Sequence, residues 1–325
     1  MRPACADARH TGLVNRPRQS RRSAPVLRVG CAMWAYKAWQ GLHFPSRLAR
    51  REQLGVYASW CNAVEGNTTF YRLPTPRSVA SWAAEAPEGF RFVFKLPRAI
   101  THEHHLRDVA ADHREFLKRI APLGDRAEQL SIQLPPSFGP SDLNALASFV
   151  RSLPRSHRYA VELRHHAFYD DPQLEARVER LLREHDVEWI SLDTTALYSD
   201  VPPSAAERGA RRQKPHLPRR LRALTQHPVV RFVGTDDPDQ TRAGWQPWLP
   251  MLTGWLAEGR TPTVFVHTPD NVATPPLARR LHDDVRSEVP TLAPLPQPIR
   301  AEPVEEPTLF PDEPTDTVTL PVPGS

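Results

Sequence analysis

Short apolar runs alternate with amphipathic segments along most of this 325-residue chain. Eight runs rich in β-branched or aromatic residues predict β-strands at residues 26–30, 63–67, 91–96, 130–134, 159–163, 189–193, 229–234 and 263–267. Helical periodicity between them predicts helices at residues 50–60, 76–86, 113–121, 143–153, 174–185, 248–258 and 276–285. Several of these helices open with Pro, Ser or Asp, which the first helical turn tolerates.

This alternation predicts an α/β protein in which crossover helices join parallel strands, either as an open sheet or as a closed barrel. Eight strand-helix units favour a TIM-type (β/α)8 barrel, and 325 residues suffice for one such domain with tails. An open dinucleotide-binding sheet would need a Gly-rich turn after its first strand, whereas Gly30 is followed by Cys-Ala-Met-Trp. We therefore predict a single barrel domain over residues 26–288.

Both ends of the chain are rich in Pro and charge and poor in large apolar residues. Such segments bury too little surface to offset the entropy of ordering, so residues 1–25 and 289–325 are expected to be disordered, the first basic and the second acidic. Inside the barrel, residues 194–218 form the longest segment without a predicted element. They form either a lid over the strand ends or an unstructured insert.

The formal net charge of +5 arises from 42 Lys and Arg against 37 Asp and Glu, and only four of the basic residues are Lys. This excess favours anionic partners without identifying one. Cys5, Cys31 and Cys61 lack the CxxC spacing of zinc or redox sites, which favours a reducing compartment. No apolar run approaches the roughly 18 residues of a membrane span, and the Arg-rich start has no apolar signal region. These features predict a cytoplasmic protein that does not enter membranes.

Polar and ionisable residues stand at the end of almost every predicted strand. Parallel barrel strands present their carboxyl ends at one mouth, where barrel enzymes place their active sites, so these side chains are expected to converge. Residues two apart on a strand share a face, which pairs Glu65 with Asn67 and Glu162 with Arg164. The expected mouth residues are Glu65, Asn67, Lys95, Gln133, Glu162, Arg164, Asp193, Arg231 and His267.

Two interpretations fit this set of charges. One is a structural network of salt bridges, because buried charges are costly unless they are paired. The other is a functional site, which the location at the strand ends favours. The candidate catalytic acids and bases are then Glu65, Glu162 and Asp193, and the candidate cradle for a phosphate or carboxylate is Lys95, Arg164 and Arg231.

Histidines cluster in the run Thr-His-Glu-His-His at residues 101–105 and again at residues 165–166. They suggest a divalent metal site, but they lack the HExxH spacing that places two imidazoles on one helical face. Loop histidines are the stronger reading, and no cofactor is predicted. His102 is the best of them as a catalytic proton shuttle near Lys95.

Aromatic residues, among them Trp34, Tyr36 and Tyr71, crowd the ends of the first two predicted strands. Such residues either pack the rim of the barrel or stack on a sugar or a base. Both readings remain open at this point, and the second makes Trp34 and Tyr36 candidate substrate contacts.

Several ordered motifs resemble the YecE-like family, also called domain of unknown function 72. They are Val-Gly-Cys with Trp-Ala-Tyr within 29–36, Val-Glu-Gly-Asn-Thr-Thr-Phe-Tyr-Arg-Leu-Pro at 64–74, Phe-Lys-Leu-Pro-Arg-Ala-Ile-Thr-His at 94–102, Val-Glu-Leu-Arg at 161–164, Leu-Asp-Thr at 192–194 and Val-Arg-Phe-Val-Gly at 230–234. The resemblance covers about residues 26–285. It implies a TIM-type barrel without an established reaction, and its pattern carries over to Glu65, Asn67, Tyr71, Lys95, His102, Glu162, Arg164, Asp193 and Arg231 as mouth residues.

Two positions depart from the family pattern. Relatives typically end the eighth strand with an aromatic residue followed by Asn-Asn, whereas this chain reads Val-His-Thr-Pro-Asp-Asn at residues 266–271. His267 titrates near neutrality and an amide does not, so proton handling in this cleft is expected to differ. The second strand carries Gly66 where a β-branched residue is usual.

These features lead us to expect an enzyme, a hydrolase, lyase or isomerase, that acts on an anionic, hydroxyl-rich or phosphorylated substrate. One alternative is a nucleic-acid-binding or repair-associated barrel, which the basic body and rim aromatics favour together with a fold-level analogy to barrel endonucleases. Another is a noncatalytic ligand-binding barrel. Leu309 and Phe310 resemble the Leu-Phe end of peptides that bind the bacterial sliding clamp, with Glu306 where such peptides carry Gln, so the clamp is a further candidate partner.

Overall fold

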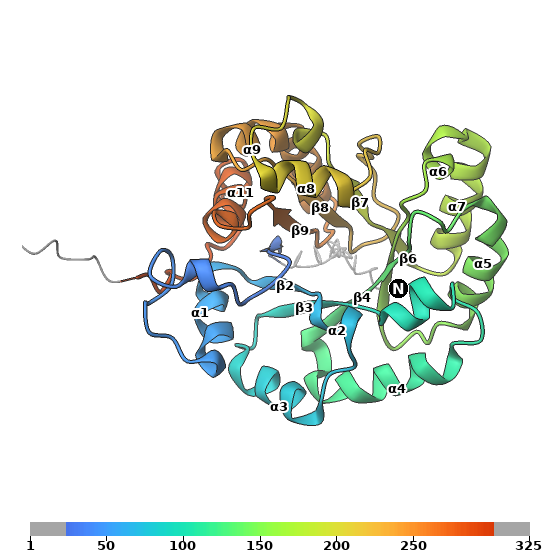
Figure 1. Ribbon diagram of the computed structural model, residues 1–325, viewed down its shortest axis with the longest axis horizontal. Helices are drawn as coiled ribbons and strands as arrows, with labels where there is room; N and C mark the ends of the chain where they lie inside the picture. Colours follow the sequence, from blue (N-terminus) through green and yellow to red (C-terminus); the bar gives the residue numbers. More distant parts are fainter. Residues whose placement is uncertain (1–23, 302–325) are drawn as a thin grey trace, which may run out of the picture.

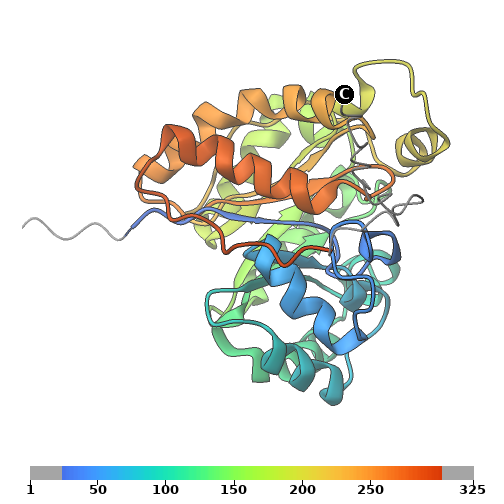
Figure 2. The same cartoon turned by 90° about the vertical axis from the view of Figure 1, so that its left-hand side faces the viewer.

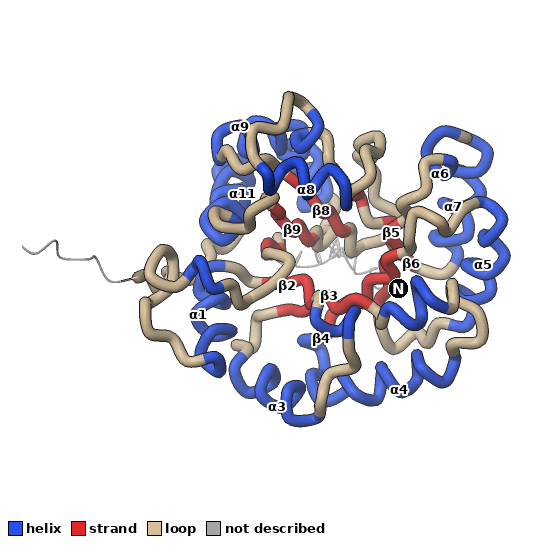
Figure 3. Tube along the Cα trace, in the orientation of Figure 1, coloured by secondary structure: helices blue, strands red, loops and turns tan. Residues whose placement is uncertain are grey.

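Parallel strands arranged in a ring form the centre of the protein, and helices surround them (Figures 1 and 3). The computed structural model describes residues 24–301. Its strands are β1 (Arg28–Gly30), β2 (Ala63–Gly66), β3 (Arg91–Lys95), β4 (Ala127–Gln133), β5 (Arg158–Glu162), β6 (Val187–Trp189), β7 (Ser191–Asp193), β8 (Val229–Val233) and β9 (Thr263–His267). They pair in parallel in two sheets, in the orders β1-β9-β8-β7 and β2-β3-β4-β5-β6.

The two sheets meet at two seams, which close them into one barrel. At the first seam, β6 and β7 are halves of the predicted sixth strand, separated only by Ile190. The amide of Ile190 still bonds to Val161 O at 2.8 Å, whereas Ser191 already pairs with Val230 of the other sheet. The prediction of eight barrel strands in a TIM-type fold is therefore confirmed, with the sixth strand split between the two sheets.

Side chains replace part of the backbone ladder at the second seam, between β1 and β2. The Tyr57 hydroxyl accepts from Cys31 N at 2.7 Å and donates to Ala63 O at 2.9 Å. Only glycine fits opposite this seam, because a Cβ on Gly30 would lie 2.0 Å from Ala63 O. Tyr57 therefore satisfies two buried backbone groups that would otherwise lack partners.

Helices follow the strands and cover the outside of the barrel. They are α1 (Gln53–Trp60), α2 (Thr68–Tyr71), α3 (Pro76–Glu85), α4 (Ala110–Ile120), α5 (Leu143–Ser152), α6 (Ala167–Asp170), α7 (Pro172–Glu184), α8 (Ala205–Gln213), α9 (Pro238–Trp245), α10 (Leu249–Ala257) and α11 (Thr274–Glu288). Proline occupies the first turn of α3, α7 and α9, and Thr75, Asp171 and Asp237 cap their first amides. The short helices α2 and α6 and the helix α9 were not predicted from the periodicity.

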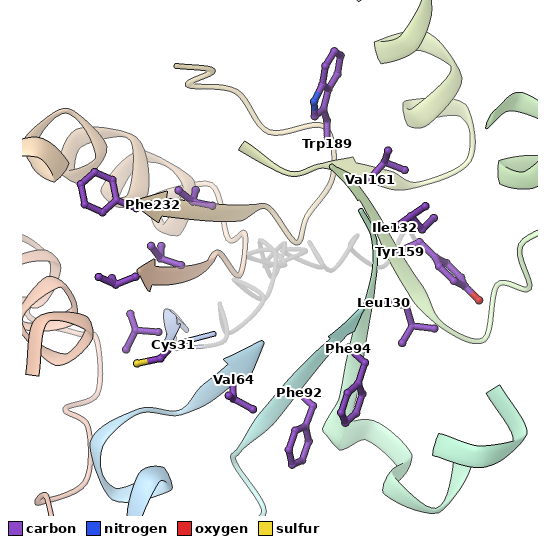
Figure 4. Close-up of a cluster of buried hydrophobic side chains, with 14 of the residues drawn as sticks. Cys31, Val64, Phe92, Phe94, Leu130, Ile132, Tyr159, Val161, Trp189 and Phe232 are labelled. Atoms are coloured by element: carbon purple, nitrogen blue, oxygen red, sulfur yellow. The ribbon is translucent and has the colours of Figure 1, made fainter. Parts of the chain in front are cut away.

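The strands alternate between an outward apolar face and an inward face that becomes polar toward the carboxyl ends. Figure 4 shows Val64, Phe94, Val161 and Phe232 pointing away from the centre of the ring, where they pack in the main hydrophobic core. Inside the barrel, a small apolar layer lies below the mouth, formed by Ala63, Val93, Ala160, Ile190, Val229 and Phe265. Because successive residues point to opposite faces, the residues two positions beyond this layer point into the mouth.

The chain beyond α11 packs against the barrel, so the prediction of a disordered tail starting at residue 289 is wrong for residues 289–301. Leu292 and Leu295 are buried, and Ile299 bonds to Ser59 and Trp60 of α1 through its amide and carbonyl. Figure 2 shows this last segment, in red, running beside α1, in blue. The sequence signal was weak here because the segment is Pro-rich and has no period. The remaining parts of both predicted tails, including Leu309, Phe310 and Cys5, lie outside the described residues.

Residues 194–218 fold over one side of the mouth instead of forming an unstructured insert. They contain α8, which Ser204 caps, and α8 lies in front of β7 and β8 in Figure 1. Below it, an apolar cluster joins Leu192 and Val233 at the ends of β7 and β8 to Leu197, Ala210 and Leu217 of the segment. The buried Glu207 accepts from Asp236 N at 2.9 Å, which ties α8 to the loop after β8.

Cys31 and Cys61 are free and buried in the hydrophobic core. Within residues 24–301, none of the helices has the length and apolar character needed to cross a membrane.

Candidate functional site

A buried network of charged side chains fills the mouth of the barrel. Its members come from the inward face of six different strands, or directly follow one, and each lies at or near the carboxyl end of its strand. We call this set the mouth network: Glu65 (β2), Lys95 (β3), Gln133 (β4), Glu162 (β5), Arg164 after β5, Arg231 (β8) and His267 (β9). The parallel register places these ends on one side of the barrel, as expected for the strand ends of a TIM-type fold.

Arg231 lies at the centre of this network and bridges both glutamates. Its Nε lies 2.6 Å from Glu65 Oε1, its second terminal nitrogen lies 3.2 Å from Glu65 Oε2, and its first contacts Glu162 Oε2. All three side chains are almost completely buried. The planar guanidinium suits this role because it offers nitrogens in two directions within one rigid plane.

Two further cations complete the network at its edges. Lys95 Nζ donates to Gln133 Oε1 at 2.7 Å and lies 3.5 Å from Glu65 Oε2. Arg164 Nε donates to Glu162 Oε1 at 2.6 Å. The mouth network therefore contains two carboxylates and three groups that can carry a positive charge.

The two glutamates remain ionised over the whole neutral range. Burial alone would raise the pKa of Glu65, but Arg231 and Lys95 overcome this effect and lower it to about 2. Burial opposes ionisation of Glu162 in the same way, and Arg231 and Arg164 lower its pKa to about 2. The same carboxylates hold the pKa of Arg231 above its ordinary value despite burial. These carboxylates are weak proton acceptors, because a general base works best with a pKa near the working pH.

Lys95 differs from the other members because its charge is easily lost. Burial and the positive charge of Arg231 lower its pKa, Glu65 and Glu162 oppose this effect, and the result is a pKa of about 7. The amine is therefore poised between its two protonation states at neutral pH. A lysine in this condition is suited to act as a nucleophile or base.

Two imidazoles near the network are neutral at physiological pH. Burial and the neighbouring Arg231 and Lys214 hold the pKa of His267 far below its ordinary value. Its Nε2 lies 3.9 Å from Glu65 Oε2 and, among residues 24–301, has no hydrogen-bond partner. His102 lies on a π-helical turn, Ala99–Glu103, where burial and Arg164 lower its pKa to about 4.

A cavity of about 360 Å³ opens beside the network between the end of β5 and the segment that contains α8. Its lining is Pro136, Arg164, His165, His166, Arg212, Gln213, Lys214 and Pro215, so none of its described lining residues is Asp or Glu. Arg164 belongs to both places, because its Nε binds Glu162 while the side chain lines the cavity. Burial, Arg231 and Arg164 lower the pKa of Lys214 to about 8. We call this cavity the basic pocket.

With this geometry established, comparison with known proteins identifies the family. The model of the family described as "Protein of unknown function DUF72" matches residues 28–300. This chain belongs to the DUF72 family. It is 37% identical over 271 residues to the UPF0759 protein YecE of Escherichia coli K12, covering 83% of this chain and 97% of the relative. The corresponding protein of E. coli O157:H7 matches equally well.

Two solved DUF72 structures resemble the fold at low sequence identity. A protein from Thermotoga maritima MSB8 has a TM-score of 0.58 at 19% identity and covers 82% of this chain and 99% of its own. A protein from Enterococcus faecalis V583 also has a TM-score of 0.58, at 14% identity, with 80% and 96% covered. The predicted resemblance and the barrel fold are therefore confirmed. Neither protein is named for an activity.

The DUF72 barrel does not bring Asp193 into the mouth, which corrects the prediction for that residue. Its carboxylate points outward with Trp189 and Ser191 and accepts from Thr195 N at 2.9 Å and from the side chains of Arg219 and Trp248, each at 2.7 Å. This carboxylate, which accepts from three donors on the helix side of the strand, joins β7 to Arg219 in the loop before β8 and to Trp248 in the turn directly before α10. Asp193 is thus a structural residue in this arrangement.

The aromatic residues that were candidate substrate contacts do not line the mouth network. Trp34 packs edge-on against Trp82 and Phe92, and Tyr36 packs against Trp39, so both belong to the rim of the core. Tyr71 is 78% exposed at the end of α2. Asn67 begins α2 beside the mouth, where its side-chain nitrogen donates to Ala32 O at 2.8 Å.

The sequence suggested a metal site at its histidines but did not reveal the basic pocket. Within residues 24–301, no group of three or more His, Cys, Asp or Glu side chains is arranged to hold a metal ion. Arg212 and Lys214 were missed as site residues because they lie in the long segment that had no predicted element. The available signal was that Lys214 is one of only four lysines in this Arg-rich chain.

Proposed function

We propose that this DUF72 protein is an enzyme that binds an anionic, hydroxyl-rich or phosphorylated small molecule at the mouth of its barrel. The observation that carries the proposal is the basic pocket, in which Arg164, His165, His166, Arg212 and Lys214 surround about 360 Å³. A site with this excess of donors favours a phosphate or carboxylate, since Arg and Lys bind both through charge-assisted hydrogen bonds. The volume suits a small ligand.

The charge balance supports dividing the mouth into two parts. In the mouth network the cations are largely neutralised by Glu65 and Glu162, so Lys95 and Arg231 are poor members of the anion cradle that the sequence suggested. The described lining of the basic pocket contains no carboxylate, and of its cations Arg164 alone is bound by a glutamate of the network. We therefore assign anion binding to the pocket, with Arg164 as the link, and the reacting chemistry to the network.

Proton transfer is assigned to the neutral imidazoles instead of the glutamates. Glu65 and Glu162 are held by Arg231 and Arg164, so they fix charge and orientation. His267 offers an unbonded Nε2 at the network, and His102 lies at its edge. Such a set serves a hydrolase, lyase or isomerase that moves a proton on a bound polyol or sugar acid.

Experiments can distinguish this enzyme from two alternative functions, nucleic-acid binding and ligand binding without catalysis. The case for a nucleic-acid partner is weaker in the folded protein than in the sequence, because stacking on bases needs exposed aromatic rings. Trp34 and Tyr36 pack into the core rim, and only Tyr71 among these three is strongly exposed. A noncatalytic ligand-binding barrel would show thermal stabilisation by its ligand without turnover.

Inorganic phosphate is the simplest probe of the pocket. Titration calorimetry on the full chain should show binding, and K214Q and R212Q should each weaken it roughly ten- to hundredfold, as expected when a contact worth about 1.5–3 kcal/mol is lost. R208Q is the matched control, since Arg208 is an exposed arginine of the same helix that does not line the pocket. Phosphate binding that is absent, or equally affected by all three variants, would refute the pocket assignment. A turnover screen over sugar phosphates and sugar acids then tests catalysis, and stabilisation without turnover would leave the noncatalytic barrel.

A further inference from the structure

The positive charges of the mouth network outnumber its negative charges when Lys95 is protonated. We infer that Lys95 is a covalent nucleophile that forms an imine with the carbonyl carbon of an aldehyde or ketone whose phosphate or carboxylate group occupies the basic pocket. This inference rests on the proposed function, because the anion in the pocket is what delivers the carbonyl to the mouth network.

A count of charges gives the first argument. Glu65 and Glu162 supply two negative charges, and Arg231 and Arg164, each in direct contact with one or both of them, supply two positive charges. The buried network is therefore neutral when Lys95 carries no proton. Burial penalises every unbalanced charge, so the amine is the member that loses its charge most readily. The pKa of about 7 agrees with this count.

The position of the amine gives the second argument. Lys95 ends β3 on the inward face, and Gln133 Oε1 holds its Nζ at 2.7 Å from the neighbouring strand. A nucleophile on a rigid strand, fixed by a neutral acceptor, is oriented without being tied into a strong ion pair. The nearest carboxylate oxygen, Glu65 Oε2, lies at the longer distance of 3.5 Å.

A second nitrogen, on an imidazole, lies near the same carboxylate oxygen. His267 Nε2 is 3.9 Å from Glu65 Oε2, is buried, and has no hydrogen-bond partner among the described residues. A buried nitrogen without a partner is costly and is expected to find one in a bound ligand. Lys95 Nζ and His267 Nε2 thus both lie within 4 Å of Glu65 Oε2, where we infer that one attacks and the other moves a proton.

The step balances without an oxidant or reductant. The lone pair of the neutral Nζ attacks the carbonyl carbon, and the π electrons of the C=O bond move to oxygen. His267 Nε2 takes one proton from the nitrogen and passes it to that oxygen, which gives a neutral carbinolamine. The same imidazole then carries the second proton of the nitrogen to the oxygen as the C–O bond breaks. Water leaves, and the carbon remains joined to Nζ by a C=N bond. Such an imine withdraws electrons from the adjacent C–C or C–H bond, which suits the lyase or isomerase chemistry of the proposed function.

The charged and titratable groups around the Lys95 amine favour its neutral form. They come from six different elements and are Glu65 of β2, His102 of the turn after β3, Glu162 and Arg164 at β5, Lys214 after α8, Arg231 of β8 and His267 of β9. The cations outnumber the carboxylates, and both imidazoles are neutral, so the surroundings favour the unprotonated amine.

Reductive trapping tests the inference on the full chain. The protein is incubated at pH 7 with glyceraldehyde 3-phosphate or glyoxylate and sodium cyanoborohydride, which reduces an imine to a stable secondary amine, and the label is mapped by peptide mass spectrometry. Only four lysines compete, and Lys37 and Lys118 are exposed. At this pH an amine with a pKa of about 7 is neutral about a thousandfold more often than an ordinary lysine and about fivefold more often than Lys214 with its pKa of about 8, so Lys95 should carry most of the label. Labelling should reach half its maximum near pH 7.

The controls separate this inference from the proposed function. K118R should leave the labelling unchanged and K95R should abolish it, with circular dichroism confirming that the variant is folded. Label confined to Lys37, Lys118, Lys214 or the terminal amine would overturn the inference. Phosphate is titrated into the same samples. If phosphate binds and Lys95 stays unlabelled, the imine is wrong and the pocket stands. If phosphate does not bind and Lys95 stays unlabelled, both are wrong. Label on Lys95 that phosphate displaces supports both.

Discussion

Replacing Arg231 with methionine should convert the mouth network from a stabilising element into a destabilising one. The substitution keeps much of the side-chain volume and removes the one group among residues 24–301 that contacts both Glu65 and Glu162. Two carboxylates would then remain buried, with Lys95 and Arg164 as partial compensation. Removing one partner of a buried ion pair costs about 3–5 kcal/mol, and we expect a loss in this range at pH 7.

The pKa values of Glu65 and Glu162 give an independent magnitude for this stability and the direction in which it changes with pH. A fall from 4.5 to about 2 corresponds to about 3 kcal/mol of stability for each glutamate, and to less than the sum for both because they share Arg231. Because the folded pKa is depressed, this stability is present above the unfolded value of 4.5 and is lost as the pH falls toward 2. In R231M the carboxylates lose their main partner and burial raises their pKa values. Its stability should therefore rise on mild acidification, opposite to the parent.

Urea unfolding followed by far-UV circular dichroism between pH 4 and 8 measures both effects. R51M serves as the control, since Arg51 is 81% exposed and lies 4.0 Å from Glu52, and it should change the free energy of unfolding by less than about 0.5 kcal/mol. A loss below about 1 kcal/mol in R231M would refute the reasoning about the buried pairs. An unchanged pH slope would refute the assignment of the slope to these glutamates.

Three further predictions follow from the fold. G30A should destabilise the barrel severely or prevent folding, because its Cβ would lie 2.0 Å from Ala63 O, whereas G55A on α1 has open space and should be neutral or stabilising in the same urea titration. D193N should cost about 1–3 kcal/mol because its carboxylate binds three donors, yet calorimetry should show unchanged phosphate affinity, and weakened binding would return this residue to the site. Truncation after residue 288 should lower the Tm relative to truncation after residue 301, because two buried leucines are lost, and equal Tm values would contradict the packing of this segment.

The barrel could be predicted from the sequence because local and global signals agree along most of the chain. Each strand carries apolar residues on its outward face, and the helices begin at recognisable caps and prolines. The failures lie where those signals are absent. Residues 289–301 have no period and are held by isolated contacts to α1, and residues 194–218 fold around an apolar cluster whose members are far apart in the sequence.

The prediction for Asp193 failed because its strand has apolar residues on both faces. In β5, Val161 points outward and the neighbouring glutamate points inward, so the alternation reveals the orientation. In the sixth strand, Trp189 points outward while Ile190 joins the inner layer, and hydrophobicity alone cannot assign the face of the next polar residue. The split at Ile190 also passes the second half of the strand to the other sheet. A polar residue at a strand end is therefore informative only when its strand has a clear polar and a clear apolar face.

The role of Lys95 changed for a related reason. A lysine at a strand end predicts a positive charge at the mouth, but the sequence does not show which groups surround that charge. In the folded chain, Arg231 and Arg164 already neutralise the two glutamates. A positive charge on Lys95 is therefore not balanced by any carboxylate of the network. We therefore propose that anion binding falls to residues such as Lys214, which reach the mouth from the long segment after β7. The same folding that gathers the predicted cations separates them into an interior that two glutamates neutralise and a rim whose described lining contains no carboxylate, and this separation is the physical basis of the two roles that we propose.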